Sequence, residues 1–299
     1  MHDDEMPTSV DLVWRLIVAQ FPRWKNLEIA AVPSAGTDNA LYRLGTDLVV
    51  RLPRIHWAAG QIEKENHWLP VLAPQLPLAI PTPLVLGEPG EGYPWRWSVY
   101  RWLDGQNAAL EHLADPQQTA TDLAHFIGAL WEIDVTGGPP PGAQNSGRGE
   151  PLIRRDARTR EAIHALHDTF DSATITVIWE SALAAPPWNA HPVWIHGDLQ
   201  AGNLLAVDGV LQAVIDFGCL GVGDPAADIM TAWLYLSEDT RATFRASLPI
   251  DPATWKRARG WALSVGLIAL PYYRQTNPAL AGIARRAINE TLIDWQTES

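Results

Sequence analysis

The chain has 299 residues, of which 47% are hydrophobic and 19% charged, and 34 acidic against 22 basic residues give a net charge of −12. This composition excludes a disordered chain, and the length allows one large domain or two lobes. The negative charge argues against nucleic acid or an anionic membrane as the main partner. It weakly favours a small-molecule partner that could be cationic.

Several features are those expected of a cytoplasmic protein. The single cysteine, Cys219, excludes an internal disulfide and is compatible with a reducing compartment. The N-terminal sequence MHDDEMPTS is acidic and lacks the apolar run of a signal peptide. The longest apolar stretch, residues 262–270, is far shorter than the roughly 20 residues that span a bilayer. We therefore expect a cytoplasmic location and no membrane partner.

The first hundred residues are predicted to mix strands with two helices. An apolar stripe predicts a helix over 10–21, with Ser9 as its N-cap and Pro22 after its end. A second helix is expected over 57–72. Runs of β-forming residues predict strands at 27–32, 40–44, 48–52, 84–87 and 95–103.

Two charged residues in this region are expected to meet. Side chains alternate along a strand, so Arg51 shares a face with Val49 and opposes its apolar neighbours. In the helix over 57–72, Glu65 lies on the apolar stripe. An unpaired buried carboxylate is costly, and Arg51 is the candidate partner. The alternative is that Glu65 lies in solvent at the edge of the stripe.

Most of the remaining chain is predicted to be helical. A loop rich in proline and glycine, residues 136–150, is expected to be too polar for the core. Asp208-Gly209 predicts a type I′ hairpin between strands at 204–207 and 210–215. Helices are expected over 116–134, 154–170, 174–185, 225–237, 239–247, 252–270 and 279–296.

The stretch 194–228 contains three polar residues that follow or interrupt apolar runs. Asp198 comes three residues after Ile195, which ends a short apolar strand; Asn203 lies five residues later, and Asp216 follows a second strand. An Asp can accept the proton of a hydroxyl group, and Asn and Asp oxygens can hold Mg²⁺. A purely structural role for all three is the less favoured alternative. We expect His196 to hold the loop by bonding to backbone.

The motifs in this stretch resemble those of two related groups of kinases. H-G-D-L-Q-A-G-N and D-F-G are similar to the H-R-D-L-x-x-x-N and D-F-G motifs of protein kinases. G-D-P-x-x-D, residues 223–228, resembles the aminoglycoside phosphotransferase family instead. Gly197 stands where protein kinases have Arg, and only residues 217–223 separate Asp216 from Asp224. An activation segment does not fit into this interval, so no protein substrate is expected.

The family resemblance implies a two-lobed, protein-kinase-like fold of the α+β class. The N-terminal lobe, residues 1–102, would contain about five antiparallel strands and a helix and would bind the nucleotide. The C-terminal lobe, residues 103–299, would be mainly helical and would hold the catalytic residues and the substrate. The implied reaction is transfer of the γ-phosphoryl group of ATP or GTP to a hydroxyl group of a small molecule, with Mg²⁺ as cofactor.

The resemblance also implies roles for individual residues. Asp198 is the expected catalytic base, and Asn203 and Asp216 are the expected metal ligands. Arg51 stands where the family usually has Lys and keeps the positive charge. The expected nucleotide-binding residues are Ser34, Gly36, Val49, Arg51, Glu65, Tyr100 and Trp102. An ordinary hairpin turn is the alternative for the polar loop 34–39, which contains the first two.

The acceptor molecule does not follow from the motifs. An aminoglycoside antibiotic is favoured, and the alternatives are a macrolide or a metabolite such as choline, homoserine or a sugar. A pocket rich in carboxylates would favour an aminoglycoside, and an apolar, Trp-lined pocket a macrolide. The alternative of another class is a pseudokinase that binds nucleotide without turnover. The intact trio of Asp198, Asn203 and Asp216 argues against it.

Overall fold

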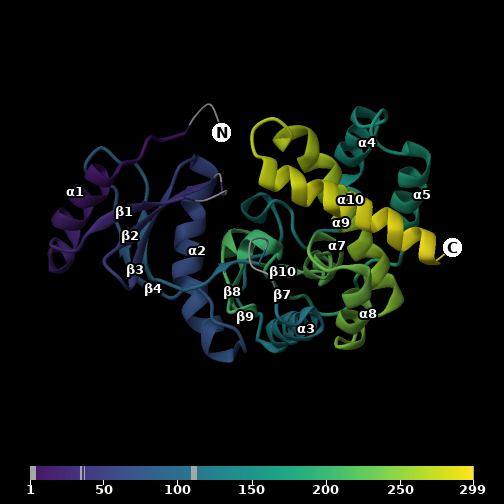
Figure 1. Ribbon diagram of the computed structural model, residues 1–299, viewed down its shortest axis with the longest axis horizontal. Coiled ribbons are helices and arrows are strands. Elements are labelled where there is room, and N and C mark those ends of the chain that lie inside the picture. Colours follow the sequence, from purple (N-terminus) through teal and green to yellow (C-terminus); the bar gives the residue numbers. More distant parts are fainter. Residues whose placement is uncertain (1–4, 34–35, 37, 109–112, 299) are drawn as a thin grey trace. The chain divides into compact units, whose positions relative to one another are not determined.

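The computed structural model describes residues 5–33, 36, 38–108 and 113–298 (Figure 1). The chain divides into two compact units, each described here by itself. The first contains Met1–Asp104 and Ala213–Gly218, and the second contains Gly105–Gln212 and Cys219–Ser299. The first division follows Asp104, where the sequence predicted a lobe boundary after residue 102. Strand β9 carries the chain from the second unit into the first.

A five-stranded antiparallel sheet forms the first unit, as predicted (Figure 1). Its spatial order is β1-β2-β3-β5-β4. The strands are β1 (Ile29–Val32), β2 (Asn39–Leu44), β3 (Leu48–Pro53), β4 (Pro83–Gly87) and β5 (Trp97–Arg101). Strand β5 is shorter than the predicted run over 95–103.

One helix packs on each face of this sheet (Figure 1). Helix α1 (Val10–Gln20) begins where the Ser9 hydroxyl accepts the Leu12 N–H at 3.1 Å, as predicted. Its buried residues and the fully buried Val50 of β3 belong to one core. Helix α2 (His56–Leu72) covers the opposite face, toward which Arg51 points. The alternation predicted for β3 is therefore confirmed.

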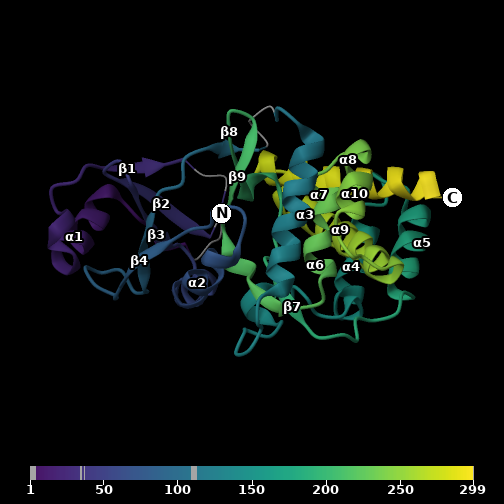
Figure 2. The same ribbon diagram turned by 90° about the horizontal axis from the view of Figure 1, so that it is seen from below.

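Helices dominate the second unit (Figure 2). The longest are α9 (Pro252–Tyr273) and α10 (Pro278–Glu298), which pack against each other. The other helices are α3 (Pro116–Glu132), α4 (Asp156–Ala165), α5 (Ser172–Leu183), α6 (Ala226–Ile229), α7 (Thr231–Leu234) and α8 (Glu238–Ala246). Among the residues that the structure describes, no helix has the length and apolarity needed to cross a membrane.

Short strands frame the loops of the central stretch. β7 (Val193–Ile195) pairs antiparallel with β10 (Gly221–Gly223). β6 (Gln106–Asn107), β8 (Leu204–Val207) and β9 (Val210–Val214) form a three-stranded sheet. The predicted hairpin is confirmed, and both turn residues, Asp208 and Gly209, have positive φ, at 51° and 76°.

Three predictions for the second unit were wrong in detail. The helix expected over 154–170 is the shorter α4, which follows a 3-10 turn over Leu152–Arg155 and ends at Ala165, before Asp171 caps α5. The helix expected over 225–237 is divided into α6 and α7. The loop 136–150 is not too polar for the interior: Asn145 is fully buried and Arg148 is 9% exposed. Both side chains find hydrogen-bond partners, which compensates for their burial.

The N-cap of α9 gives a test of local stability. The Asp251 carboxylate accepts the N–H groups of Ala253 and Thr254 at 2.8 and 2.9 Å. Burial alone would raise the pKa of Asp251, but these bonds and the Thr254 hydroxyl outweigh it and lower the pKa below 3.8. We expect Asp251→Ala to reduce the free energy of unfolding by about 1 kcal/mol at pH 7, measured by urea unfolding.

The pH dependence of this loss has a defined sign. Because the carboxyl pKa is lower in the folded than in the unfolded chain, the stabilisation is present above pH 3.8. It is lost as the pH falls through the folded value, so the wild type and Asp251→Ala should converge in acid. Asp251→Asn keeps a capping oxygen and should show no such convergence with Asp251→Ala. Equal losses for the Asn and Ala variants at pH 7 would contradict the capping role.

Candidate active site

Arg51 and Glu65 form a buried ion pair in the first unit. Nη1 of Arg51 donates to both Glu65 carboxylate oxygens, at 2.7 and 2.8 Å. The Tyr100 hydroxyl donates to Glu65 Oε2 at 2.8 Å. Glu65 is fully buried, and the Arg51 side chain is 9% exposed. The ion pair expected from helical periodicity is therefore present, and the alternative of a solvent-exposed Glu65 is excluded.

Asp216 joins this pair as a second carboxylate. Nη2 of Arg51 donates to Asp216 Oδ1 at 3.0 Å, so one guanidinium connects two carboxylates. Asp216 has a φ of 63°, a left-handed conformation that is uncommon outside glycine, and its side chain is 47% exposed. The backbone thus holds a carboxylate that is fixed by Arg51 on one oxygen and open to solvent.

The charges in this cluster shift one another's titration. Burial alone would lower the pKa of Arg51, but the Glu65 and Asp216 carboxylates outweigh it and raise the pKa well above its ordinary value. Burial raises the pKa of Glu65, and the Arg51 guanidinium and Tyr100 hydroxyl oppose that rise. Arg51 therefore remains a cation at every pH at which the protein is folded.

The other expected nucleotide-binding residues are placed as follows. Val49 is partly buried on β3, where it pairs with Tyr100 of β5. The Trp102 backbone N–H already donates to Asp47 O at 2.8 Å, so it is not available to a nucleotide base. Gly36 is exposed, and Ser34 lies outside the described residues. Roles in nucleotide binding stay predictions for all of them.

The proposed base lies in a loop of the second unit that follows β7. Nδ2 of Asn203 donates to the backbone O of Asp198 at 2.8 Å and to its carboxylate Oδ2 at 2.9 Å. This use of the amide nitrogen leaves the Asn203 carbonyl oxygen as the group that could bind a cation. The Asp198 side chain is 34% exposed. The structure thus brings together two of the three residues singled out by the motif.

The same loop is held by backbone hydrogen bonds to buried side chains. The fully buried Asp228 carboxylate accepts the N–H of His196 at 2.9 Å and of Gly197 at 2.6 Å. Burial raises the pKa of Asp228, and the nearby His196 and the two N–H groups oppose the rise. The His196 ring Nδ1 accepts the Asp198 N–H at 3.2 Å. His196 therefore holds the loop, as predicted from the sequence.

Arg148, which is not among the residues expected at the site, also contacts this loop. Its Nε donates to the backbone O of Gly197 at 2.6 Å, and its Nη2 lies 4.0 Å from Asp198 Oδ1. In the sequence Arg148 is the first of five arginines between residues 148 and 160, a basic run expected to form a solvated helix face or one wall of the substrate site. A contact across 49 residues leaves no periodic pattern that could have predicted it.

The oxygen donors present suit Mg²⁺. In the described part of the chain, no three His, Cys, Asp or Glu side chains gather as a metal site. Asn203 offers an amide oxygen in one unit, and Asp216 offers a carboxylate in the other. Mg²⁺ takes few protein oxygens and completes its shell with water and phosphate. Each of these oxygens is of the kind that Mg²⁺ binds, and a shared role of Asn203 and Asp216 in holding the metal stays a prediction.

A cavity of about 410 Å³ lies in the second unit beside the loop of Asp198. Ala201, between Asp198 and Asn203, forms part of its wall. The other lining residues are Leu113, Pro116, Thr119, Leu234, Tyr235, Leu236, Ser237, Thr240, Ala279, Gly282, Ile283 and Arg286. Of the described residues that line it, Arg286 alone is charged, and none is a carboxylate.

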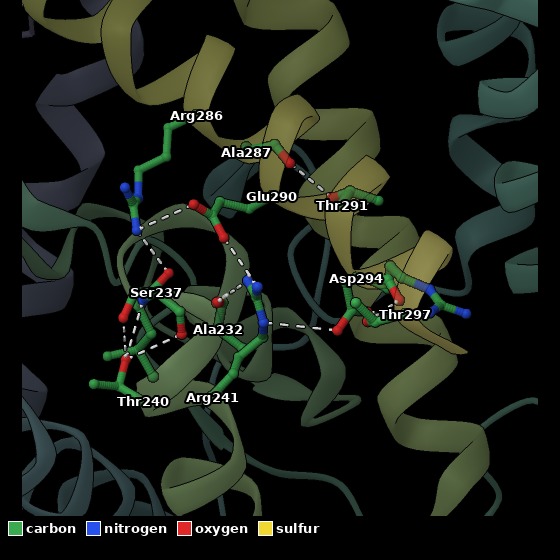
Figure 3. Close-up of polar contacts among 12 residues, drawn as sticks. Ala232, Ser237, Thr240, Arg241, Arg286, Ala287, Glu290, Thr291, Asp294 and Thr297 are labelled. Carbon is green, nitrogen blue, oxygen red and sulfur yellow. Dashed lines mark hydrogen bonds and ion pairs between the residues drawn. The ribbon is translucent and has the colours of Figure 1, made fainter. Parts of the chain in front are cut away.

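Ion pairs between α8 and α10 support this wall (Figure 3). Arg286 donates to Leu236 O at 2.7 Å and lies 3.6 Å from Glu290. Arg241, which is 4% exposed, contacts Glu290 at 2.9 Å and Asp294 at 3.6 Å. The nearby Glu290 is therefore neutralised by two guanidinium groups and offers little attraction to a cationic ligand.

Comparisons with known proteins place the chain in a family. The sequence model described as "APH: Phosphotransferase enzyme family" matches residues 30–261. Aminoglycoside 3'-phosphotransferase of Escherichia coli is 35% identical over 75 residues, which cover 24% of this chain and 28% of that relative. The chain therefore matches less than a third of the length of this curated relative.

Solved structures show a similar fold at low sequence identity. The GDP and kanamycin complex of APH(2")-IIIa superposes with a TM-score of 0.70 at 20% identity, covering 94% of this chain and 98% of the other. Macrolide 2'-phosphotransferase MphH from Brachybacterium faecium gives 0.61 at 22% identity, covering 94% and 98%. The fold is that of kinase-like phosphotransferases, with an antiparallel sheet and a mainly helical C-terminal part. Because the family match extends over most of its length, the chain belongs to the APH phosphotransferase enzyme family.

Proposed function

We propose that this protein is a small-molecule kinase that transfers the γ-phosphoryl group of ATP or GTP to a hydroxyl group, with Asp198 as the base. The observation that carries the proposal is the bonding of Asn203 to Asp198. It fixes the carboxylate beside a side chain whose remaining oxygen suits Mg²⁺. The partial exposure of Asp198 leaves the carboxylate accessible to a substrate.

In phosphoryl transfer the protein mainly positions the reacting groups and neutralises the charge of the phosphates. Asp198 would orient the acceptor hydroxyl and take its proton as the oxygen attacks the γ-phosphorus and the bond to the β-phosphate oxygen breaks. Arg51, held by Glu65, would neutralise phosphate oxygens of the nucleotide. Asn203 and Asp216 would hold Mg²⁺, which supplies further positive charge at the transferring group.

An aminoglycoside is the first candidate for the acceptor. It is the class named by the curated relative, and kanamycin occupies one of the similar structures. A specific observation favours a second candidate, an acceptor with little positive charge. The cavity beside Ala201 is mainly apolar, and its described lining contains no carboxylate to bind several ammonium groups. This group includes neutral metabolites and macrolides, the class in the name of MphH.

A screen against both acceptor classes tests the proposal. The full chain with Mg²⁺ and either ATP or GTP should phosphorylate at least one hydroxyl compound, detected by nucleotide consumption and by the mass of the product. A higher kcat/KM for aminoglycosides would support the first candidate, and a higher kcat/KM for acceptors with little positive charge would support the second. Nucleotide binding without transfer or hydrolysis across the whole library would instead support a pseudokinase. Preferential transfer to aminoglycosides would refute the second candidate.

A further inference from the structure

The residue before the proposed base is held by hydrogen bonds at both ends of its backbone. The Gly197 N–H donates to the buried Asp228 carboxylate at 2.6 Å, and the Gly197 carbonyl accepts from Arg148 Nε at 2.6 Å. We infer that Arg148 is a positioning residue for Asp198, an inference that rests on the proposed role of Asp198 as base. The guanidinium fixes the peptide that leads into Asp198 and lies beside its carboxylate.

The position of Arg148 is determined by a closely packed segment. The buried Asn145 donates from Nδ2 to the Arg148 backbone O at 3.0 Å. The next residue, Gly149, has a φ of 83°, and a Cβ there would come within 2.9 Å of Ile195 and 3.1 Å of Gly223. The Gly149 carbonyl also accepts the Asp224 N–H at 3.1 Å. These contacts therefore hold the backbone from which the Arg148 side chain extends.

The Arg148 guanidinium is buried, so it needs anions or hydrogen-bond acceptors close by to compensate its charge. Arg148 is 9% exposed, and the Trp261 ring centroid is 5.7 Å from its Cζ. Among the residues that the structure describes, Asp198 is the one carboxylate within 4.0 Å of the guanidinium. The buried Asp228 carboxylate, which bonds to the Gly197 N–H, adds a longer-range attraction. A buried cation constrains the carboxylate and the carbonyl closest to it, since loss of either would weaken its compensation.

The geometry also explains why residue 197 is a glycine. Gly197 has a φ of 81°, where side chains are strained, and a Cβ would lie 2.8 Å from Cys219 O and 3.0 Å from Arg148 Cγ. The Arg148 stem thus occupies the space next to the backbone of residue 197. The H-R-D motif has its arginine at this position. In this chain a guanidinium reaches the same loop from residue 148.

Arg148→Gln tests the inference, because the amide can still donate to Gly197 O but has no charge to place beside Asp198. We expect kcat for phosphoryl transfer, or for hydrolysis of the Mg-nucleotide, to fall by roughly 10- to 100-fold, since small displacements of reacting groups cost about this much. KM for the nucleotide should stay within about threefold. Hydrogen exchange of the amides of residues 196–198 should become faster.

Arg155→Gln is the matched control. Arg155 contacts the same Trp261 ring, with 4.7 Å from Cζ to the centroid, and its Nε donates to Ser264 at 2.9 Å. It makes no described contact with the loop of Asp198, so kcat should stay within about twofold of the wild type. Arg148→Lys keeps a positive charge and should recover a substantial part of the activity lost in Arg148→Gln. If Arg148→Gln does not fold, the kcat of Arg148→Lys and its exchange rates at residues 196–198 test the positioning role instead.

The outcomes separate this inference from the proposed function. If Asp198→Ala is inactive while Arg148→Gln keeps wild-type kcat and exchange rates, the positioning role is refuted and the proposed function stands. If the Lys and Gln variants lose equal activity and Arg155→Gln loses as much, Arg148 contributes only to packing, which also overturns the inference. If Asp198→Ala retains wild-type transfer, the proposed function itself fails.

Discussion

Asp198→Asn should abolish most phosphoryl transfer while leaving nucleotide binding intact. A positioned general base typically contributes about 10²- to 10⁴-fold to the rate, and an amide cannot take the proton of the hydroxyl. Asn is preferable to Ala because an amide oxygen can still accept the bond that Asn203 Nδ2 makes to Asp198 Oδ2 at 2.9 Å. The loop should therefore keep its conformation. Initial rates of transfer and calorimetric titration with Mg-ATP and Mg-GTP measure the two effects.

Asp208→Asn is the matched control for this substitution. Asp208 is an exposed residue of the β8–β9 turn with a φ of 51°, a conformation that Asn tolerates well. The same chemical change there should alter the rate by less than about twofold. Transfer by Asp198→Asn at more than about a tenth of the wild-type rate would refute the assignment of Asp198 as the base. A large loss of affinity for the Mg-nucleotide would instead show that Asp198 acts in nucleotide binding.

Periodicity in the sequence predicted the parts of the site that lie on regular elements. Alternation along β3 placed Arg51 opposite the apolar core, and the helical stripe of α2 placed Glu65 inward, so their ion pair could be expected. Tyr100 was predicted only as a nucleotide-binding residue. Its hydroxyl proved to donate the third hydrogen bond that Glu65 accepts, which follows from strand pairing that the sequence does not specify.

Contacts between loops that are distant in the sequence could not be predicted. Arg148 lies in a loop that composition marks as exposed, and its burial depends on tertiary contacts with Gly197 and Trp261. The cavity beside Ala201 is lined from α3, α7, α8 and α10, so no single stretch of sequence reveals its apolar character. Local patterns therefore indicated the residues proposed for phosphoryl transfer, whereas the features that affect loop position and the charge of the cavity arise from contacts between distant segments.

Glu65→Ala should destabilise the first unit strongly. The change removes the carboxylate that accepts three hydrogen bonds, two from Arg51 and one from Tyr100, and leaves the buried guanidinium with Asp216 as its remaining carboxylate. Breaking a buried ion pair by removing one partner typically costs about 3–5 kcal/mol of unfolding free energy. Denaturant unfolding followed by tryptophan fluorescence, with and without Mg-nucleotide, measures the loss.

Glu63→Ala separates this effect from the loss of any acidic residue in α2. Glu63 is 56% exposed and forms a surface ion pair with Arg96 at 3.3 Å, so its removal should cost no more than about 1 kcal/mol.

The double variant Arg51→Met with Glu65→Leu should be more stable than Glu65→Ala, because it leaves no buried charge unpaired. It should nevertheless bind Mg-nucleotide poorly if Arg51 contacts phosphate. Recovery of both stability and nucleotide affinity would show that the ion pair contributes only to folding. Recovery of stability alone would show that the charge of Arg51 contributes to nucleotide binding.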